Sequence, residues 1–140
     1  MVAVKYLVHV FDGIENTLNP QAVYLLFDDG VDLTFRCAND GETLLCLKGS
    51  VDIYPIDMGE FGSEIVKNVT VEEPWKDVVG QPVLAMYKTT TDVGNIAIGY
   101  KLVFGTEEIH LLNLGDSLFV FDSSPSEVLA EENVSFRQVL

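Results

Sequence analysis

Basic residues are scarce in this chain: its 140 residues include 8 Lys and Arg against 22 Asp and Glu, and the formal net charge is −14. A surface charge of this sign repels nucleic acid and the anionic face of a membrane, because both are negatively charged themselves. We therefore expect neither as a partner. The same charge speeds the encounter with a basic protein, although in many acidic proteins it serves only solubility.

Groups that perform covalent chemistry are also few, with two cysteines and two histidines. The sequence contains no Gly-x-Ser-x-Gly elbow, P-loop or Cys-x-x-Cys pair. His9 and His110 each fall inside an expected strand, where an imidazole on a solvated face is the ordinary interpretation. Glu107, Glu108 and His110 come nearest to a metal-ligand spacing, but zinc sites usually need three or four convergent ligands. The sequence thus favours a protein without catalytic residues, metal or cofactor, and leaves an unrecognised enzyme as an alternative.

The two cysteines, Cys37 and Cys46, bracket a polar turn. A two-residue turn at Gly41-Glu42 would place them opposite each other, so a cross-strand disulfide is one alternative. The apolar start of the chain lacks a basic region and a cleavage site and is too short to span a bilayer, so we expect a cytoplasmic protein. In that reducing compartment, cysteines with apolar neighbours are usually reduced core thiols.

Alternating apolar residues between Gly, Asp and Asn turns predict short β-strands along the whole chain. The expected strands cover residues 2–11, 23–28, 31–37, 44–48, 65–71, 83–89, 95–104, 108–113 and 134–140. Asp29-Gly30 is typical of a two-residue hairpin turn. Residues 55–62 indicate a surface loop in which Met58 and Phe61 are hydrophobic anchors.

One strand pattern occurs twice. Val23 to Asp28 followed by Gly41 to Cys46 reappears as Tyr100 to Gly105 followed by Gly115 to Val120, with an alternating strand between the two parts of each copy. Duplication and chance are equal alternatives, because few residue types suit a half-buried strand.

These patterns predict a single domain over residues 1–140 of mainly β class. We expect an antiparallel sandwich or a partly open barrel, built from two similar β-meander units at about residues 21–54 and 97–122, with one or two short helices. One helical segment follows Pro74, and another follows a capping box at Ser124-Pro-Ser-Glu127.

The single tryptophan, Trp75, lies on the first of these helical segments. A tryptophan there either seals an open end of the β structure or anchors an interface. The mean hydropathy of +0.24 is high for so acidic a chain and favours a homodimer that covers apolar surface.

The leading functional hypothesis is an acidic binding or interaction module, in its sharpest form a bacterial immunity-type inhibitor of a basic protein. The expected partner-binding residues are Asp28, Asp29, Asp32, Glu107, Glu108 and Trp75. One alternative is a small-ligand-binding β-barrel or an unrecognised enzyme, and another is a self-assembling structural subunit.

Overall fold

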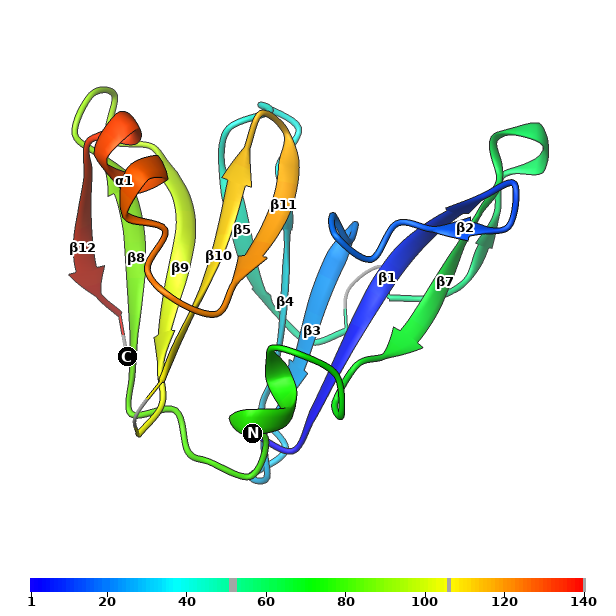
Figure 1. The fold of residues 1–140 in the computed structure, drawn as a ribbon, viewed down its shortest axis with the longest axis horizontal. Coiled ribbons are helices and arrows are strands. Elements are labelled where there is room, and N and C mark those ends of the chain that lie inside the picture. The colour runs from blue at the N-terminus through cyan, green and yellow to red at the C-terminus, as the bar shows by residue number, and fades with distance from the viewer. Residues whose placement is uncertain (51–52, 106, 140) are drawn as a thin grey trace.

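A computed structural model, which describes residues 1–50, 53–105 and 107–139, shows two antiparallel β-sheets (Figure 1). Sheet A contains β1 (Ala3–Phe11), β2 (Ile14–Glu15), β3 (Ala22–Leu26), β4 (Asp32–Cys37), β5 (Leu44–Lys48), β6 (Ile56–Asp57) and β7 (Ser63–Asn68). Sheet B contains β8 (Ala85–Thr91), β9 (Ala97–Val103), β10 (Glu108–Leu114), β11 (Ser117–Phe121) and β12 (Val134–Gln138). The predicted mainly β class is confirmed, and the sheets form a sandwich, the first of the two predicted architectures.

Both sheets have the same strand order. Sheet A runs β5-β4-β3-β1-β7-β6, with β2 beside β1, and sheet B runs β11-β10-β9-β8-β12. In each sheet the first strand along the chain has a three-stranded meander on one side and a later strand on the other; β2 and β6 are additions to sheet A without a counterpart in the described part of sheet B. The meanders β3-β4-β5 and β9-β10-β11 correspond to the two predicted units at about 21–54 and 97–122. Within these units, residues 51–52 and 106 lie outside the described residues. The likeness therefore extends to β1 and β7, which correspond to β8 and β12.

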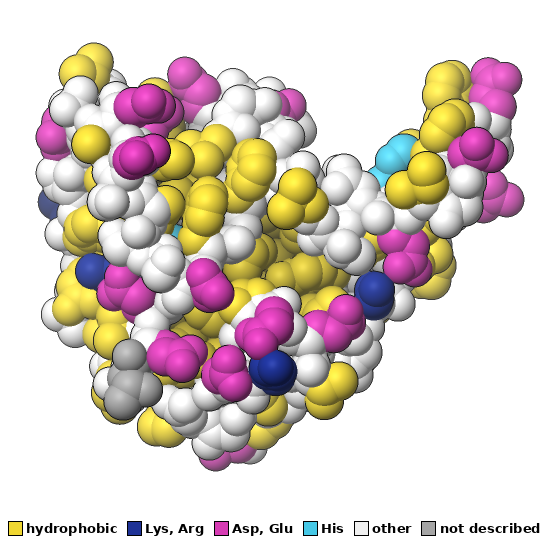
Figure 2. All heavy atoms as spheres, in the orientation of Figure 1, with side chains coloured by type: hydrophobic (Ala, Val, Ile, Leu, Met, Phe, Trp, Pro, Cys, Tyr) yellow, Lys and Arg dark blue, Asp and Glu magenta, His cyan; other side chains and the backbone are white. Residues whose placement is uncertain are grey.

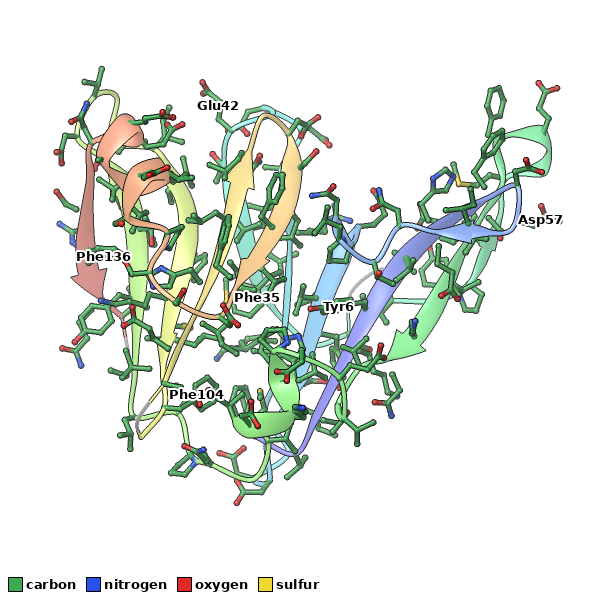
Figure 3. The ribbon with its side chains drawn as sticks, in the orientation of Figure 1. Tyr6, Phe35, Glu42, Asp57, Phe104 and Phe136 are labelled. Atoms are coloured by element: carbon green, nitrogen blue, oxygen red, sulfur yellow. The ribbon has the colours of Figure 1, made fainter. Side chains whose placement is uncertain are left out.

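The core lies between the facing sides of the two sheets. Phe35 of β4 and Tyr100 of β9 meet edge to face with their ring centroids 5.4 Å apart. Figure 3 shows Phe35 and Phe104 in the body of the molecule, and both are fully buried. Leu25, Leu44, Leu102 and Leu111 belong to the same hydrophobic cluster. A ligand inside the sandwich would have to displace these side chains, which weighs against the predicted ligand-binding barrel interior.

In the described part of the chain, short helical segments connect the strands: η1 (Gly59–Phe61), η2 (Trp75–Asp77) and α1 (Ser126–Glu132). Leu129 of α1 packs on sheet B in a second apolar cluster with Leu112 and Ile98. The predicted capping box does not form, because α1 begins at Ser126 with Pro125 at the N-cap and no side-chain cap. Within the described ranges, no helix has both the length and the apolar character needed to cross a membrane.

Neither of the two-residue turns considered beside β4, at Asp29-Gly30 and at Gly41-Glu42, forms. Asp29-Gly30 lies in a three-residue loop, closed by a 2.9 Å hydrogen bond from the Phe27 N–H to the Val31 carbonyl. Gly30 has φ of 84°, as the third position of such a loop requires. On the other side of β4, the Asp40 carboxylate accepts the N–H groups of Glu42 and Thr43 and so organises a longer loop.

That longer loop changes the pairing of the cysteines. Cys37 lies opposite Leu44, whereas Cys46 lies opposite Phe35. The disulfide alternative is therefore wrong, and both residues are free thiols. The disulfide alternative depended on a two-residue turn at Gly41-Glu42, which would have placed the two cysteines opposite each other. The hydrogen bonds to Asp40 favour the wider loop instead.

Candidate functional site

The five acidic residues predicted to bind a partner lie in two equivalent turns, one in each sheet. Asp28 and Asp29 lie between β3 and β4 and Asp32 is the first residue of β4, whereas Glu107 precedes β10 and Glu108 is its first residue. The start of the chain and the segment after η2 link the two turns at one end of the sandwich. The Val2 N–H bonds to the Leu26 carbonyl, the Gly80 N–H bonds to the Met1 carbonyl, and the Gly105 N–H bonds to the Gln81 side chain. The structure thus brings these acids to the same end of the molecule.

Among the described residues, three of the five carboxylates have partners: Asp29 accepts a 3.0 Å hydrogen bond from the Val31 backbone N–H, and Asp32 and Glu108 contact side chains. Asp32 accepts a 2.8 Å hydrogen bond from the Tyr24 hydroxyl, and Glu108 lies 3.0 Å from the His110 Nε2. His110 is only 1% exposed, so its expected place on a solvated face is wrong. It is covered by Phe136 of β12, a strand from the far end of the sequence. Asp28, Asp29 and Glu107 are the exposed members of the set.

Trp75 does not belong to an accessible surface. Its side chain is fully buried in the core, and its indole N–H donates a 2.6 Å hydrogen bond to the Tyr6 hydroxyl. The expectation that Trp75 binds a partner is therefore corrected: of the two predicted roles, it seals one end of the sandwich. The hydrogen bond to Tyr6 satisfies the indole N–H inside the core, as a buried tryptophan requires.

Alkaline pH is expected to destabilise this core. Burial raises the pKa of Cys37 and of Cys46 from 9.0 to about 11, and the pKa of Tyr6 from 10.0 to about 12. Unfolded chains lose these protons at the ordinary pKa values, whereas the folded protein retains them. The free energy of unfolding is therefore highest below pH 9 and falls as the pH rises through the raised values.

Urea unfolding at pH values from 8 to 10.5 measures this effect. A double variant with Cys37→Ser and Cys46→Ser is the control, because it should lose the part of the decrease that begins near pH 9 and keep the part due to Tyr6. A wild-type unfolding midpoint that stays constant over this range would contradict the prediction.

The most distinctive surface is a β arm, formed by residues that the sequence predicts to be a strand end and a loop. We define the β arm as residues 9–15 and 55–64, which comprise the end of β1, β2, β6, η1 and the start of β7. Figure 1 shows it extending from the sandwich, away from sheet B, and Figure 3 places Asp57 on it. None of its residues, all of which are described, is buried.

Apolar side chains are exposed on the β arm. Phe11 and Ile14 form a cross-strand pair between β1 and β2 and are 56% and 72% exposed. Met58 and Phe61, expected to be hydrophobic anchors, are exposed as well, because η1 lies beyond the reach of the core. Figure 2 shows hydrophobic and acidic side chains side by side on this projection.

Backbone pairing holds the β arm in shape. β1 and β7 pair from Lys5–Asn68 to Val10–Ser63, so the arm continues two long strands of sheet A. Gly62 has φ of 93°, and a Cβ there would lie 2.1 Å from the Val10 carbonyl oxygen, so glycine is required at this close approach. The His9 Nε2 lies 2.8 Å from the Phe61 carbonyl oxygen and ties η1 to β1. The arm is thus a defined extension of the sheet.

A cleft of about 570 Å³ lies between the β arm and the sandwich. Its lining includes Tyr54, Ile56 and Glu64 on the arm side and Arg36 and Asp116 on the sandwich side. This volume is in the range of small-molecule sites, although such sites are usually more apolar than this cleft. In the part of the chain that the structure describes, no three His, Cys, Asp or Glu side chains are arranged to bind a metal ion.

The chain matches no family model, and comparisons with curated proteins and with solved structures find no significant match. Alternation in residues 2–11 indicated the end of β1, but β2 and β6 were not predicted, and β7 begins at Ser63, before the expected strand at 65–71. The apolar residues of 55–62 were visible in the sequence. Their common position was not, because it depends on the long-range pairing of β1 with β7.

Proposed function

We propose that this protein is a protein–protein interaction module and that the β arm is its partner-binding element. The observation that carries the proposal is the exposure of Phe11, Ile14, Met58 and Phe61 on one projecting element. Single exposed apolar residues are normal on protein surfaces, whereas a group of them on one projection is typical of a binding site. Aromatic and methionine side chains are also the residues enriched in the buried centres of interfaces.

The backbone of the β arm supports the same proposal. Among the described residues, β2 pairs only with β1 and β6 pairs only with β7, so each presents an outer strand edge. Such edges accept a strand from another protein, with main-chain hydrogen bonds supplying affinity and neighbouring side chains supplying specificity. The apolar residues on the arm would provide those side-chain contacts.

The acidic end of the sandwich has a separate part in this proposal. Asp28, Asp29 and Glu107 are exposed there and add to the overall net charge of −14. Such a field speeds association with a basic protein and affects the association rate more than the lifetime of the complex. An immunity-type inhibitor of a basic protein is the most specific form of this function, with the arm forming the contact and the acids steering the approach.

A self-assembling subunit is the second candidate. The same exposed side chains and strand edges would serve a contact between copies of the chain. Sedimentation velocity over a range of protein concentrations separates the two functions, because self-assembly shifts the molecular mass with concentration and binding to a different protein does not.

Photo-cross-linking tests the role of the β arm. A photoreactive amino acid is placed at Ile14 or Phe61, and in control variants at Val71 or Val93, which are both 81% exposed and lie outside the arm. In an extract of the source cells, the arm positions are expected to give a protein adduct that the control positions do not. Excess wild-type protein should suppress this adduct, whereas excess Phe61→Ser protein should compete about 30-fold less well, the loss expected at the centre of an interface. Equal adducts at all four positions would contradict the proposal.

A further inference from the structure

We infer that the β arm binds a basic protein, placing its apolar tip between Lys or Arg side chains of that partner, and that the partner is not a second copy of this chain. This inference rests on the proposed role of the arm and adds that the Lys or Arg side chains of the partner lie directly beside its apolar contact surface. It comes from the charges that lie among the exposed apolar residues.

The β arm has charges of one sign. Its two segments contain neither Lys nor Arg, and their acids are Asp12, Glu15, Asp57, Glu60 and Glu64. Among the described residues, Lys67 of β7 neutralises one of them, with its Nζ 3.2 Å from the Glu15 carboxylate. Asp12, Asp57 and Glu60 are exposed and are not part of any ion pair between described residues.

The acids and the apolar residues of the β arm are direct neighbours. Asp12 follows Phe11 at the tip of the hairpin, and Glu60 precedes Phe61 in η1. A partner that covers the two aromatic rings must therefore also cover or approach these carboxylates. A carboxylate that loses its hydration without gaining a cation opposes binding, so the partner needs Lys or Arg beside its apolar contact surface.

A second copy of the chain is poorly suited to supply those cations. Each copy has 8 Lys and Arg against 22 Asp and Glu. Lys67 and Lys76 are in ion pairs with Glu15 and Glu73, and Lys101 lies over the rings of Tyr87 and Phe136. Contact between two copies would thus place the acids of the arm in a field of the same sign, whereas a basic partner complements them.

A random-peptide display library selected against the full-length protein tests this inference. Bound peptides are sorted by counter-selection on a double variant with Ile14→Ser and Phe61→Ser, which removes apolar surface from the arm. The matched control carries Val71→Ser and Val93→Ser, which remove apolar surface elsewhere. We expect the arm-dependent peptides to combine apolar residues with an excess of Lys and Arg.

A charge-neutral arm provides the second measurement. A variant with Asp12→Asn and Glu60→Gln is expected to bind these peptides about tenfold more weakly at low salt, and the difference should shrink at high salt. The control with Asp28→Asn and Asp29→Asn makes the same charge change at the end of the sandwich and should alter the equilibrium affinity less than twofold. Asparagine at position 12 retains the tolerance for the positive φ of 52° found there.

The possible outcomes separate the inference from the proposed function. Arm-dependent peptides without an excess of Lys and Arg, or with equal affinity for the neutral arm, would overturn the basic partner and leave the arm as a binding element. A library that yields no arm-dependent peptide would count against both. Concentration-dependent dimers of the wild type that the Ile14→Ser and Phe61→Ser variant cannot form would identify a second copy as the occupant and overturn the inference.

Discussion

Trp75→Ala is expected to lower the free energy of unfolding by about 4 kcal/mol, the usual cost of removing a buried aromatic side chain from a core. Trp75 is fully buried, and its neighbour Val78 is fully buried in the same hydrophobic cluster. The substitution leaves a cavity at the end of the sandwich and also removes the donor that hydrogen-bonds the Tyr6 hydroxyl. Both losses affect the segment that joins the two sheets.

Urea unfolding followed by circular dichroism measures this effect, because the variant loses the only tryptophan and with it the main fluorescence signal. Trp75→Phe is the matched variant: it retains most of the buried volume and loses the hydrogen bond, so a smaller decrease of about 1–3 kcal/mol is expected. A Trp75→Ala protein as stable as the wild type would show that η2 does not seal the core.

Gly99→Ala is expected to cost about 3 kcal/mol, the upper part of the usual range for overpacking. Gly99 lies in β9 opposite Leu112 of β10. A Cβ at this position would lie 2.2 Å from the Leu111 carbonyl oxygen and 2.5 Å from the Leu112 Cδ2. The first of these atoms belongs to the backbone of a central strand, so it can move only if the pairing of β9 with β10 is distorted.

Gly105→Ala provides the control for this substitution. A Cβ there has its nearest neighbour, the Gln81 Oε1, at 3.4 Å, and this atom is at the end of a flexible side chain. The expected change in the free energy of unfolding is within about 0.5 kcal/mol, as for most surface substitutions. Thermal or urea unfolding of the two variants compares their stabilities. Equal decreases in the free energy of unfolding would contradict the prediction that the close approach at Gly99 makes an added Cβ destabilising.

Features that depend on neighbouring residues could be predicted from the sequence. The strand at residues 44–48 forms with the bounds that alternation indicated, and β10 and β12 begin at the expected residues. The two β-meander units follow from the same kind of signal, since each meander connects strands that are adjacent along the chain. Pro74 likewise marked the short helical segment that carries Trp75.

Features that depend on distant partners could not be predicted in this way. The burial of His110 requires β12 to pair beside β8, and the burial of Trp75 requires Tyr6, 69 positions away in the sequence. The β arm is the clearest case, because the apolar residues of its two segments form one surface only after β1 pairs with β7. The negative charge of the chain follows from its composition. The position of the acids and apolar residues on one projecting arm became evident only from the structure.

The repeated strand order has a consequence for the ancestry of the chain. β1 to β7 and β8 to β12 are two contiguous halves, joined by the segment that contains Trp75. A chain consisting of only one half would form a single sheet with one apolar face exposed to water, and packing against an identical sheet would cover that face. If the halves arose by gene duplication, the ancestor would have been a homodimer of single sheets, and the buried centre of this monomer would be the descendant of a subunit interface.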